Sequence, residues 1–247
     1  MSGQHAVVVG GTRGLGRIIV ENFLARGCVV SVVSRRKPAD FAEGPRLRHF
    51  AVDLEKSETL GGLPAQIRDA LGPVSYLVLS QRFRGEGDPW VGEIQVGVTA
   101  SRDLIEGFTP HFTDHGDRAI GVVSSAYAEF VGCSQPVGYH VVKGGLNAMV
   151  RYYAVTLGRK GIRVNAIMPV THLKPESRAV YEKNEKLMEA YRRLVPLGRM
   201  GTAEESANAL DFLCSERASF INGQSLFLDG GISVVFQEEV AKSFSGL

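Results

Sequence analysis

The stretch HAVVVGGTRGLGRIIVENF, residues 5–23, decides the fold of this chain. A short apolar run ends at a glycine-rich turn, and beyond the turn the apolar residues recur at helical spacing. A strand that turns sharply into a helix opens the folds in which parallel strands alternate with helices. Its glycines let a pyrophosphate approach the backbone amides at the helix N-terminus, where the helix dipole favours negative charge. The stretch therefore predicts an α/β protein with a dinucleotide at its first turn.

The rest of the chain repeats this alternation. Six further apolar runs, rich in β-branched residues, cover residues 28–34, 47–53, 74–80, 119–125, 161–168 and 225–231. They are apolar on both faces, as the strands of a parallel sheet covered by helices must be. We expect residues 1–247 to form one domain with a Rossmann fold, a doubly wound parallel sheet of about seven strands with helices on both faces. Ligands should bind at the carboxyl ends of these strands.

One region, at about residues 171–200, departs from this rhythm. A long amphipathic helix is expected there, because apolar residues recur every seven positions. Two interpretations are open. The helix packs on the body of the domain, or it forms a lid over the ligand pocket, since insertions near strand ends often gate substrates.

The composition excludes several classes of protein. With 44% apolar and 22% charged residues, the 247-residue chain resembles globular proteins and holds no apolar run long enough to span a membrane. A formal charge of +2 without a dense basic block gives no reason to expect nucleic acid. No signal peptide is apparent and the three cysteines lack disulfide or zinc spacing, so we expect a cytoplasmic protein that binds small molecules. The two histidines of HFTDHGD, residues 111–117, are explained by a solvated helix end, so no metal is expected.

The residues near the turn favour NADP(H) as the cofactor. The second predicted strand ends in VVSRRK, where a protein that prefers NAD usually carries an acid. Arg35 and Arg36 suit a 2′-phosphate because guanidinium groups pair well with phosphate, and Arg13 in the turn can reach the same group. A solvated strand end and a preference for NAD are the competing interpretations. Asp53, followed by Leu54, is placed to meet the adenine, although Asp is also a common helix cap.

Several motifs resemble those of the short-chain dehydrogenase/reductase family over nearly the whole chain. GGTRGLG (10–16) looks like the family's Gly-x3-Gly-x-Gly turn, and YHVVK (139–143) looks like its Tyr-x3-Lys signature. GIRVNAIMP (161–169) resembles the segment that leads to the nicotinamide, and residues 196–231 are similar to the family's C-terminal run.

The resemblance implies a catalytic group of Ser125, Tyr139 and Lys143, with the adjacent Ser124 as an open alternative. Tyr139 and Lys143 are four residues apart and share one helix face. An ammonium group lowers the pKa of a nearby phenol, so that the phenol can exchange a proton with substrate while hydride moves to or from the nicotinamide. Ser125 is expected to orient the carbonyl. The full set of predicted cofactor contacts is Gly10, Thr12, Arg13, Gly14, Leu15, Gly16, Ser34, Arg35, Arg36, Asp53, Leu54, Ser80, Tyr139, Lys143, Pro169, Thr171 and His172.

The chain departs from the family's pattern at three places. The usual Asn-Asn-Ala-Gly segment is replaced by residues 79–82, the helical asparagine of the family's proton relay is Gly97, and Lys174 stands where a threonine is common. Arg82 and Arg84 are either contacts for an anionic substrate or loop arginines in water. The aromatic residues Tyr127 and Phe130 are expected to wall the pocket.

These residues predict an NADP(H)-dependent oxidoreductase that interconverts a secondary alcohol and a ketone, a ketoreductase for a sugar or another polar or anionic substrate. The loss of the asparagine keeps an alternative open, a weak or inactive NADP(H)-binding protein with a regulatory or structural role. By resemblance to the family, the protein is expected to form a homodimer or homotetramer.

Overall fold

The computed structural model describes residues 3–245, with the side chains of all of these except 57 and 245. All seven predicted strands are present and form one parallel sheet in the order β3-β2-β1-β4-β5-β6-β9. The strands are β1 (His5–Val9), β2 (Val29–Ser34), β3 (Leu47–Ala51), β4 (Tyr76–Leu79), β5 (Ala119–Val123), β6 (Arg163–Pro169) and β9 (Ser225–Leu228). The strand order reverses direction between β1 and β4, where such sheets leave a crevice at the carboxyl ends of their strands. The predicted doubly wound, single-domain fold is confirmed; residues 1–2 and 246–247 of the expected domain lie outside the described residues.

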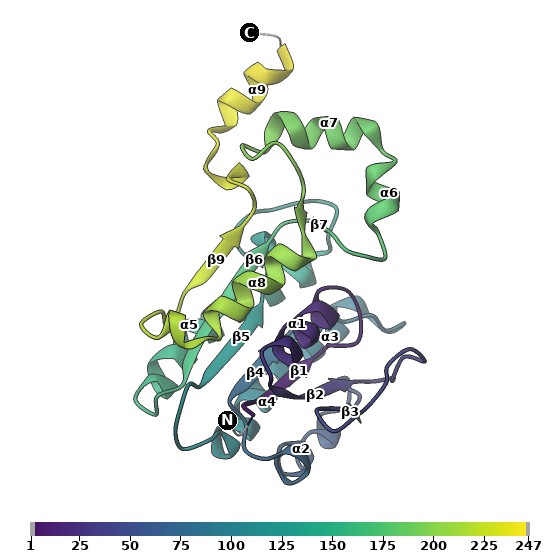
Figure 1. The fold of residues 1–247 in the computed structure, drawn as a ribbon. Helices are drawn as coiled ribbons and strands as arrows, with labels where there is room; N and C mark the ends of the chain where they lie inside the picture. The colour runs from purple at the N-terminus through teal and green to yellow at the C-terminus, as the bar shows by residue number, and fades with distance from the viewer. Residues whose placement is uncertain (1–2, 246–247) are drawn as a thin grey trace.

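Helices cover both faces of this sheet (Figure 1). On one face lie α2 (Leu63–Leu71), α4 (Ala100–Phe108) and α5 (Val137–Gly158); on the other lie α1 (Gly14–Ala25) and α8 (Ala203–Leu213). Successive residues of β1 alternate between the two cores, with Val7 and Val9 in the first and Ala6 and Val8 in the second. Burial on both sides explains why these strands are apolar throughout, since each fully buried valine stabilises the fold by about 1.5–3 kcal/mol.

The helix leading into α4 is irregular at the position of the missing asparagine. Helix α3 (Pro89–Glu93) runs directly into a π-helical turn, η2 (Ile94–Thr99), and then into α4. The Asp88 side chain caps α3 by accepting a hydrogen bond of 2.9 Å from the Trp90 amide. Gly97 lies within the π-helical turn, and its carbonyl accepts a hydrogen bond of 2.6 Å from the Ser101 hydroxyl. Such turns are frequent at functional sites.

Residues 171–200 do not form the single long helix that the heptad spacing predicted. They contain strand β7 (His172–Leu173), which pairs with β8 (Gly201–Thr202), and two helices, α6 (Arg178–Glu182) and α7 (Glu185–Leu194). The break falls at Asn184, whose side chain accepts a hydrogen bond of 3.0 Å from the Leu187 amide and so begins a new helix. An asparagine that caps a helix competes with continuing the one before it.

The two helices of this segment stand beyond the carboxyl ends of the strands, and α7 lies next to the last helix, α9 (Gln237–Ser245) (Figure 1). The side chain of Arg193 in α7 donates a hydrogen bond to the Ser243 carbonyl of α9. The remaining helical turns are short: η1 (Ser57–Thr59), η3 (Thr109–His111), η4 (Ala126–Ala128), η5 (Glu216–Ala218) and η6 (Ile232–Val234).

Candidate active site

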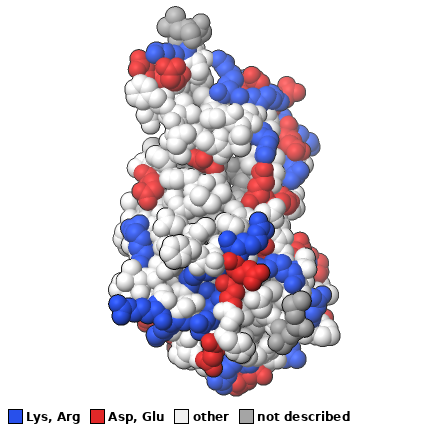
Figure 2. All heavy atoms as spheres, turned by 60° about the vertical axis from the view of Figure 1, so that its left-hand side comes forward, with Lys and Arg blue, Asp and Glu red and all other residues white. Residues whose placement is uncertain are grey.

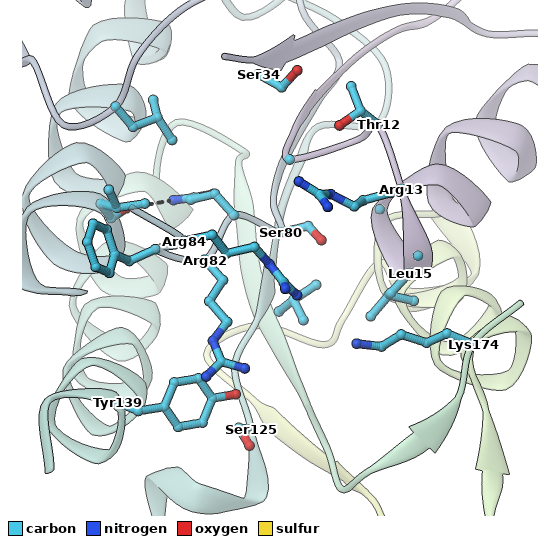
Figure 3. Close-up of a pocket in the computed structure, with 18 of the residues that line it drawn as sticks. Thr12, Arg13, Leu15, Ser34, Ser80, Arg82, Arg84, Ser125, Tyr139 and Lys174 are labelled. Atoms are coloured by element: carbon cyan, nitrogen blue, oxygen red, sulfur yellow. Dashed lines mark hydrogen bonds between the residues drawn. The ribbon is translucent and has the colours of Figure 1, made fainter. Parts of the chain in front are cut away.

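A cavity of about 1060 Å³ opens at the carboxyl ends of the strands, around the point where the strand order reverses. Every predicted catalytic residue and cofactor contact lines it, as do Arg82, Arg84 and Tyr127 (Figure 3 labels ten of the lining residues). Phe130 does not. Its ring packs against Phe227 of β9, with 5.6 Å between the ring centroids. This apolar partner does not line the cavity, so Phe130 is held away from it. The structure therefore brings together all the predicted site residues except Phe130.

The glycine turn forms one end of the cavity. Gly10 has φ +81°, and a Cβ there would lie 2.9 Å from the backbone of Gln81, so the turn packs directly on the segment after β4. A Cβ on Gly16 would collide with the Gly10 carbonyl oxygen. The glycines thus place no side chain of their own over the backbone amides at the start of α1, which is what a bound pyrophosphate requires. The residues present fit a dinucleotide at this end.

The 171–200 segment reaches over the same turn. A Cβ on Gly14, which has φ +52°, would lie 2.9 Å from Glu176 Oε1 and 3.5 Å from Lys174 Cδ. Both of these residues line the cavity, together with Ser177 and Tyr181. The segment therefore contributes one wall of the cavity, in addition to packing against α9.

Beside this turn, where the neighbouring strand β2 ends, Arg35 meets an acid that its own stretch of sequence does not contain. Arg35 donates a hydrogen bond of 2.8 Å to Glu55 and a longer one to the Arg84 carbonyl. Parallel pairing of β2 with β3 carries Glu55, which follows β3, to this place, so the lack of an acid in VVSRRK does not leave the end of β2 without one. Asp53, in turn, accepts a hydrogen bond of 3.2 Å from the Glu55 amide, as a residue that caps its own turn does.

The three catalytic candidates converge at the far end of the cavity. Tyr139 and Lys143 lie on α5, and Ser125 follows β5 at the start of η4. Burial raises the pKa of Tyr139, while a hydrogen bond with Ser125 and the positive charge of Arg82 act in the opposite direction. The neighbouring Ser124 instead donates a hydrogen bond of 3.2 Å to the Lys143 carbonyl. Of the two serines, Ser125 is the one whose hydroxyl lowers the pKa of the phenol, and it also donates a hydrogen bond of 3.5 Å to the Pro169 carbonyl.

Lys143 is deeply buried beneath this group. Its ammonium donates a hydrogen bond of 2.8 Å to the Val123 carbonyl and lies 5.5 Å from the centroid of the Tyr139 ring. Burial lowers the pKa of Lys143 to about 8, the negative charge of Glu93 opposes this change, and the charge of Arg82 adds to it. The lysine can therefore lose its proton at only mildly alkaline pH.

Arg82 lies across the ring of Tyr139. Its guanidinium carbon is 4.4 Å from the Tyr139 ring centroid, and Figure 3 shows the side chain extending over that ring. One guanidinium nitrogen donates a hydrogen bond of 2.7 Å to Gln135, and Nε is 3.8 Å from the buried carboxylate of Glu93. Sequence reasoning missed both partners. Glu93 precedes Gly97 by one helical turn, so its place on the same helix face as Gly97 was predictable from the spacing. No pattern in the neighbouring sequence distinguishes Gln135 from the other residues of its loop.

The space of the missing asparagine is closed. A Cβ on Gly97 would collide with the side chain of Val142 on α5, which is itself 2% exposed. An asparagine side chain has no room there without a change in α5. The departure from the family's pattern is therefore built into the packing of the two helices.

His172 closes the wall near β6. It is buried, its Nδ1 pairs with the Ser206 hydroxyl at 3.3 Å, and its Nε2 has no hydrogen-bond partner among the described residues. Burial, reinforced by the charge of Lys174, lowers the pKa of His172 to about 4, so the ring is neutral near pH 7. Because buried polar atoms usually have partners, this nitrogen in the cavity wall suits a polar ligand group.

Comparison with known proteins agrees with this geometry. A family model described as "Enoyl-(Acyl carrier protein) reductase" matches residues 9–233, and the chain belongs to the short-chain dehydrogenase/reductase family of oxidoreductases. Among residues 3–245, no helix combines the length and the apolar character needed to cross a membrane.

Individual relatives are similar over almost their whole length. Isoepoxydon dehydrogenase of Penicillium expansum is 31% identical over 95% of this chain and 96% of its own, and glucose 1-dehydrogenase 2 of Bacillus subtilis is 28% identical over the same shares. Among solved structures, L-sorbose reductase of Gluconobacter frateurii, complexed with NADPH and L-sorbose, is 26% identical and has a TM-score of 0.81 over 96% of this chain and 98% of its own. Aldohexose dehydrogenase of Thermoplasma acidophilum is 25% identical, with a TM-score of 0.82 over 95% of each chain.

Proposed function

We propose that this protein is an NADP(H)-dependent oxidoreductase that interconverts a secondary alcohol and a ketone, acting as a ketoreductase. One observation carries the proposal. Ser125, Tyr139 and Lys143 meet at one end of a cavity whose other end is the bare glycine turn of α1. A protein that only bound the cofactor would have no use for a serine directed at a phenol above a buried lysine.

The chain's own residues account for the proton and for the orientation of the substrate. When bound, the nicotinamide supplies the hydride for reduction or accepts it in oxidation. Tyr139 donates its phenolic proton to the carbonyl oxygen as negative charge develops there, and takes the proton back from the alcohol in the reverse direction. Ser125 donates a hydrogen bond to the same oxygen and fixes its position. Lys143, anchored on the Val123 carbonyl, stabilises the tyrosinate that remains.

The charge of the cavity supports NADP(H) over NAD(H). Seven basic residues line it, against four acidic ones, Asp53, Glu55, Glu86 and Glu176. Three of the basic residues, Arg13, Arg35 and Arg36, lie at the end where a 2′-phosphate would bind. L-sorbose reductase, a similar protein, was solved with NADPH.

A sugar or another polar or anionic compound is the proposed substrate. Burial, together with the charge of Arg84, lowers the pKa of Lys174, and burial with neighbouring arginines lowers that of Arg84. Two crowded cations of this kind are stabilised by a negatively charged group placed between them. Three similar proteins, a glucose dehydrogenase, an aldohexose dehydrogenase and a sorbose reductase, agree with a sugar.

Assembly into a homodimer or homotetramer is part of the proposal. Large apolar side chains stand exposed on α5, among them Val137, Val141 and Val155, and on β9 at Leu226. Figure 2 turns the β9 side of the molecule forward and shows a broad uncharged area across its middle. Exposed apolar areas of this extent usually mark contacts with another chain.

Turnover of NADPH tests the function directly. We would measure NADPH oxidation with ketoses, phosphorylated keto compounds and small ketones, comparing wild type with Tyr139→Phe. Loss of the proton donor should lower kcat by about 10²–10⁴-fold while the affinity for NADPH is kept. Tyr152→Phe, on the exposed side of the same helix, is the matched control and should behave as wild type. Tight NADPH binding without turnover on the whole panel would support the alternative, a cofactor-binding protein.

A further inference from the structure

Arg82 stands where the family's Asn-Asn-Ala-Gly segment ends, and its side chain fills space that a glycine would leave open. In the structure this space is the face of the Tyr139 ring, 4.4 Å from the guanidinium carbon. A guanidinium over an aromatic face is attracted by the electrons of the ring, and more strongly when the ring is a phenolate.

Two residues from separate elements hold the guanidinium in this position. Gln135, in the loop before α5, accepts a hydrogen bond of 2.7 Å, and the Glu93 carboxylate of α3 lies 3.8 Å from Nε. Glu93 is only 5% exposed, and a buried carboxylate is costly unless a cation accompanies it. Arg82 is therefore fixed from two sides rather than free to swing into solvent.

We propose that Arg82 is a catalytic residue, whose guanidinium lies on the Tyr139 ring and stabilises the tyrosinate as a second cation beside Lys143. The inference rests on the proposed function, because it concerns the proton donor of that reaction. In alcohol oxidation, Tyr139 as phenolate takes the hydroxyl proton while hydride leaves the carbinol carbon for NADP⁺, giving ketone and NADPH.

A second cation has a definite use in this site. Burial disfavours the charged form of Lys143 and lowers its pKa to about 8, so a second positive charge beside the phenolate adds stabilisation that this lysine alone does not provide. An arginine stays charged at every pH at which the protein is folded. Arg82 supplies this second positive charge from the face of the Tyr139 ring.

The other groups that face Tyr139 come from several elements, and each affects its ionisation. Lys143 faces it from α5, Ser125 and Tyr127 from η4 and the strand end before it, Glu93 from α3, and Arg84 from the loop after β4. Burial, Glu93 and Tyr127 raise the pKa of Tyr139, whereas the hydroxyl of Ser125 and the charge of Arg82 lower it. Loss of the Arg82 charge should therefore raise the pKa of Tyr139.

The test is the pH dependence of alcohol oxidation in Arg82→Met, which keeps a long side chain and removes the charge. In a plot of kcat/KM against pH, the rising limb should shift to a pH about one unit higher. At pH values below that limb, this shift is a tenfold loss of rate. Arg82→Lys, which restores a cation, should move it most of the way back. Arg84→Met removes the same charge from the same loop without a guanidinium on the ring, and should shift the limb less than Arg82→Met does.

A second measurement needs no substrate. The ultraviolet difference titration of wild type against Tyr139→Phe isolates the ionisation of this one phenol among the seven tyrosines, and the same pair is compared in the Arg82→Met background. A raised tyrosinate midpoint without any turnover would support the inference and contradict the proposed function. An unchanged midpoint and an unchanged limb would overturn the inference while turnover still stands. Equal shifts from Arg82→Met and Arg84→Met would also overturn it, since they would assign the effect to the general charge of the loop.

Discussion

The ion pair between Arg35 and Glu55 predicts how substitutions of these two residues should change the affinity for NADP⁺, and so allows the proposed cofactor preference to be tested. The pair is 2.8 Å long, with side chains 44% and 33% exposed. A 2′-phosphate that binds Arg35 has to draw the guanidinium away from this carboxylate, so the arginine and the acid should act on NADP⁺ affinity in opposite directions.

The expected magnitudes follow from these contacts. Hydrogen bonds from a guanidinium to phosphate stabilise a complex by about 1.5–3 kcal/mol, and an exposed ion pair contributes about 0.2–1 kcal/mol. The difference, about 0.5–2.8 kcal/mol, corresponds to about 2- to 100-fold weaker NADP⁺ binding in Arg35→Ala. Glu55→Gln removes the competing acceptor, and should strengthen NADP⁺ binding by about 1.4- to 5-fold.

Titration calorimetry of NADP⁺ and NAD⁺ with wild type and these two variants measures both effects. Lys37→Ala is the matched control, because Lys37 forms a similarly exposed ion pair with Glu43 two residues beyond this site. NAD⁺ affinity should change by less than twofold in Arg35→Ala. The reasoning fails if that variant leaves NADP⁺ affinity within twofold of wild type. It also fails if Glu55→Gln weakens NAD⁺ and leaves NADP⁺ unchanged, since Glu55 would then hold the ribose hydroxyls of NAD.

Two further predictions concern stability. In chemical unfolding at fixed protein concentration, Gly97→Ala should lower the free energy of unfolding by about 1–3 kcal/mol through its collision with Val142. Adding Val142→Ala should recover part of that loss, and strictly additive costs would disprove the contact. As pH falls from 6.5 to 4, wild type should lose on the order of 3 kcal/mol, because the unfolded chain protonates His172 at about 6.5 and the folded one only at about 4. His172→Gln should flatten this acid dependence in thermal unfolding scans, and an unchanged slope would rule out His172 as its source.

The seven strands and the glycine turn were predictable because their information is local. A run rich in β-branched residues and apolar on both faces indicates each strand. Glycines at the one junction of strand and helix where a phosphate can approach indicate the turn. The heptad spacing at 171–200 was misleading for a related reason. A repeat of apolar residues does not reveal that Asn184, between them, ends one helix and caps the next.

The site was predictable in part. Tyr139 and Lys143 share a helix face by their spacing alone, and their resemblance to a known signature added Ser125 from a distant strand end. Phe130 was expected in the cavity wall on the ground of its place in the loop, yet it packs on Phe227. A loop side chain packs on whichever apolar surface it reaches. That surface belongs to another part of the chain, so the loop's own sequence does not identify it.

The sequence by itself determined the alternation of strands and helices, the bare turn at the start of α1 and the tyrosine and lysine on one face of α5. These follow from backbone preferences and the periods of regular structure, which act over a few residues. Only the tertiary structure decided that Glu55 meets Arg35, that Val142 closes the space beside Gly97, and that Arg82 lies over Tyr139. Each of these contacts joins elements that the parallel sheet brings together, so it depends on strand order, strand register and helix packing rather than on any nearby stretch of chain.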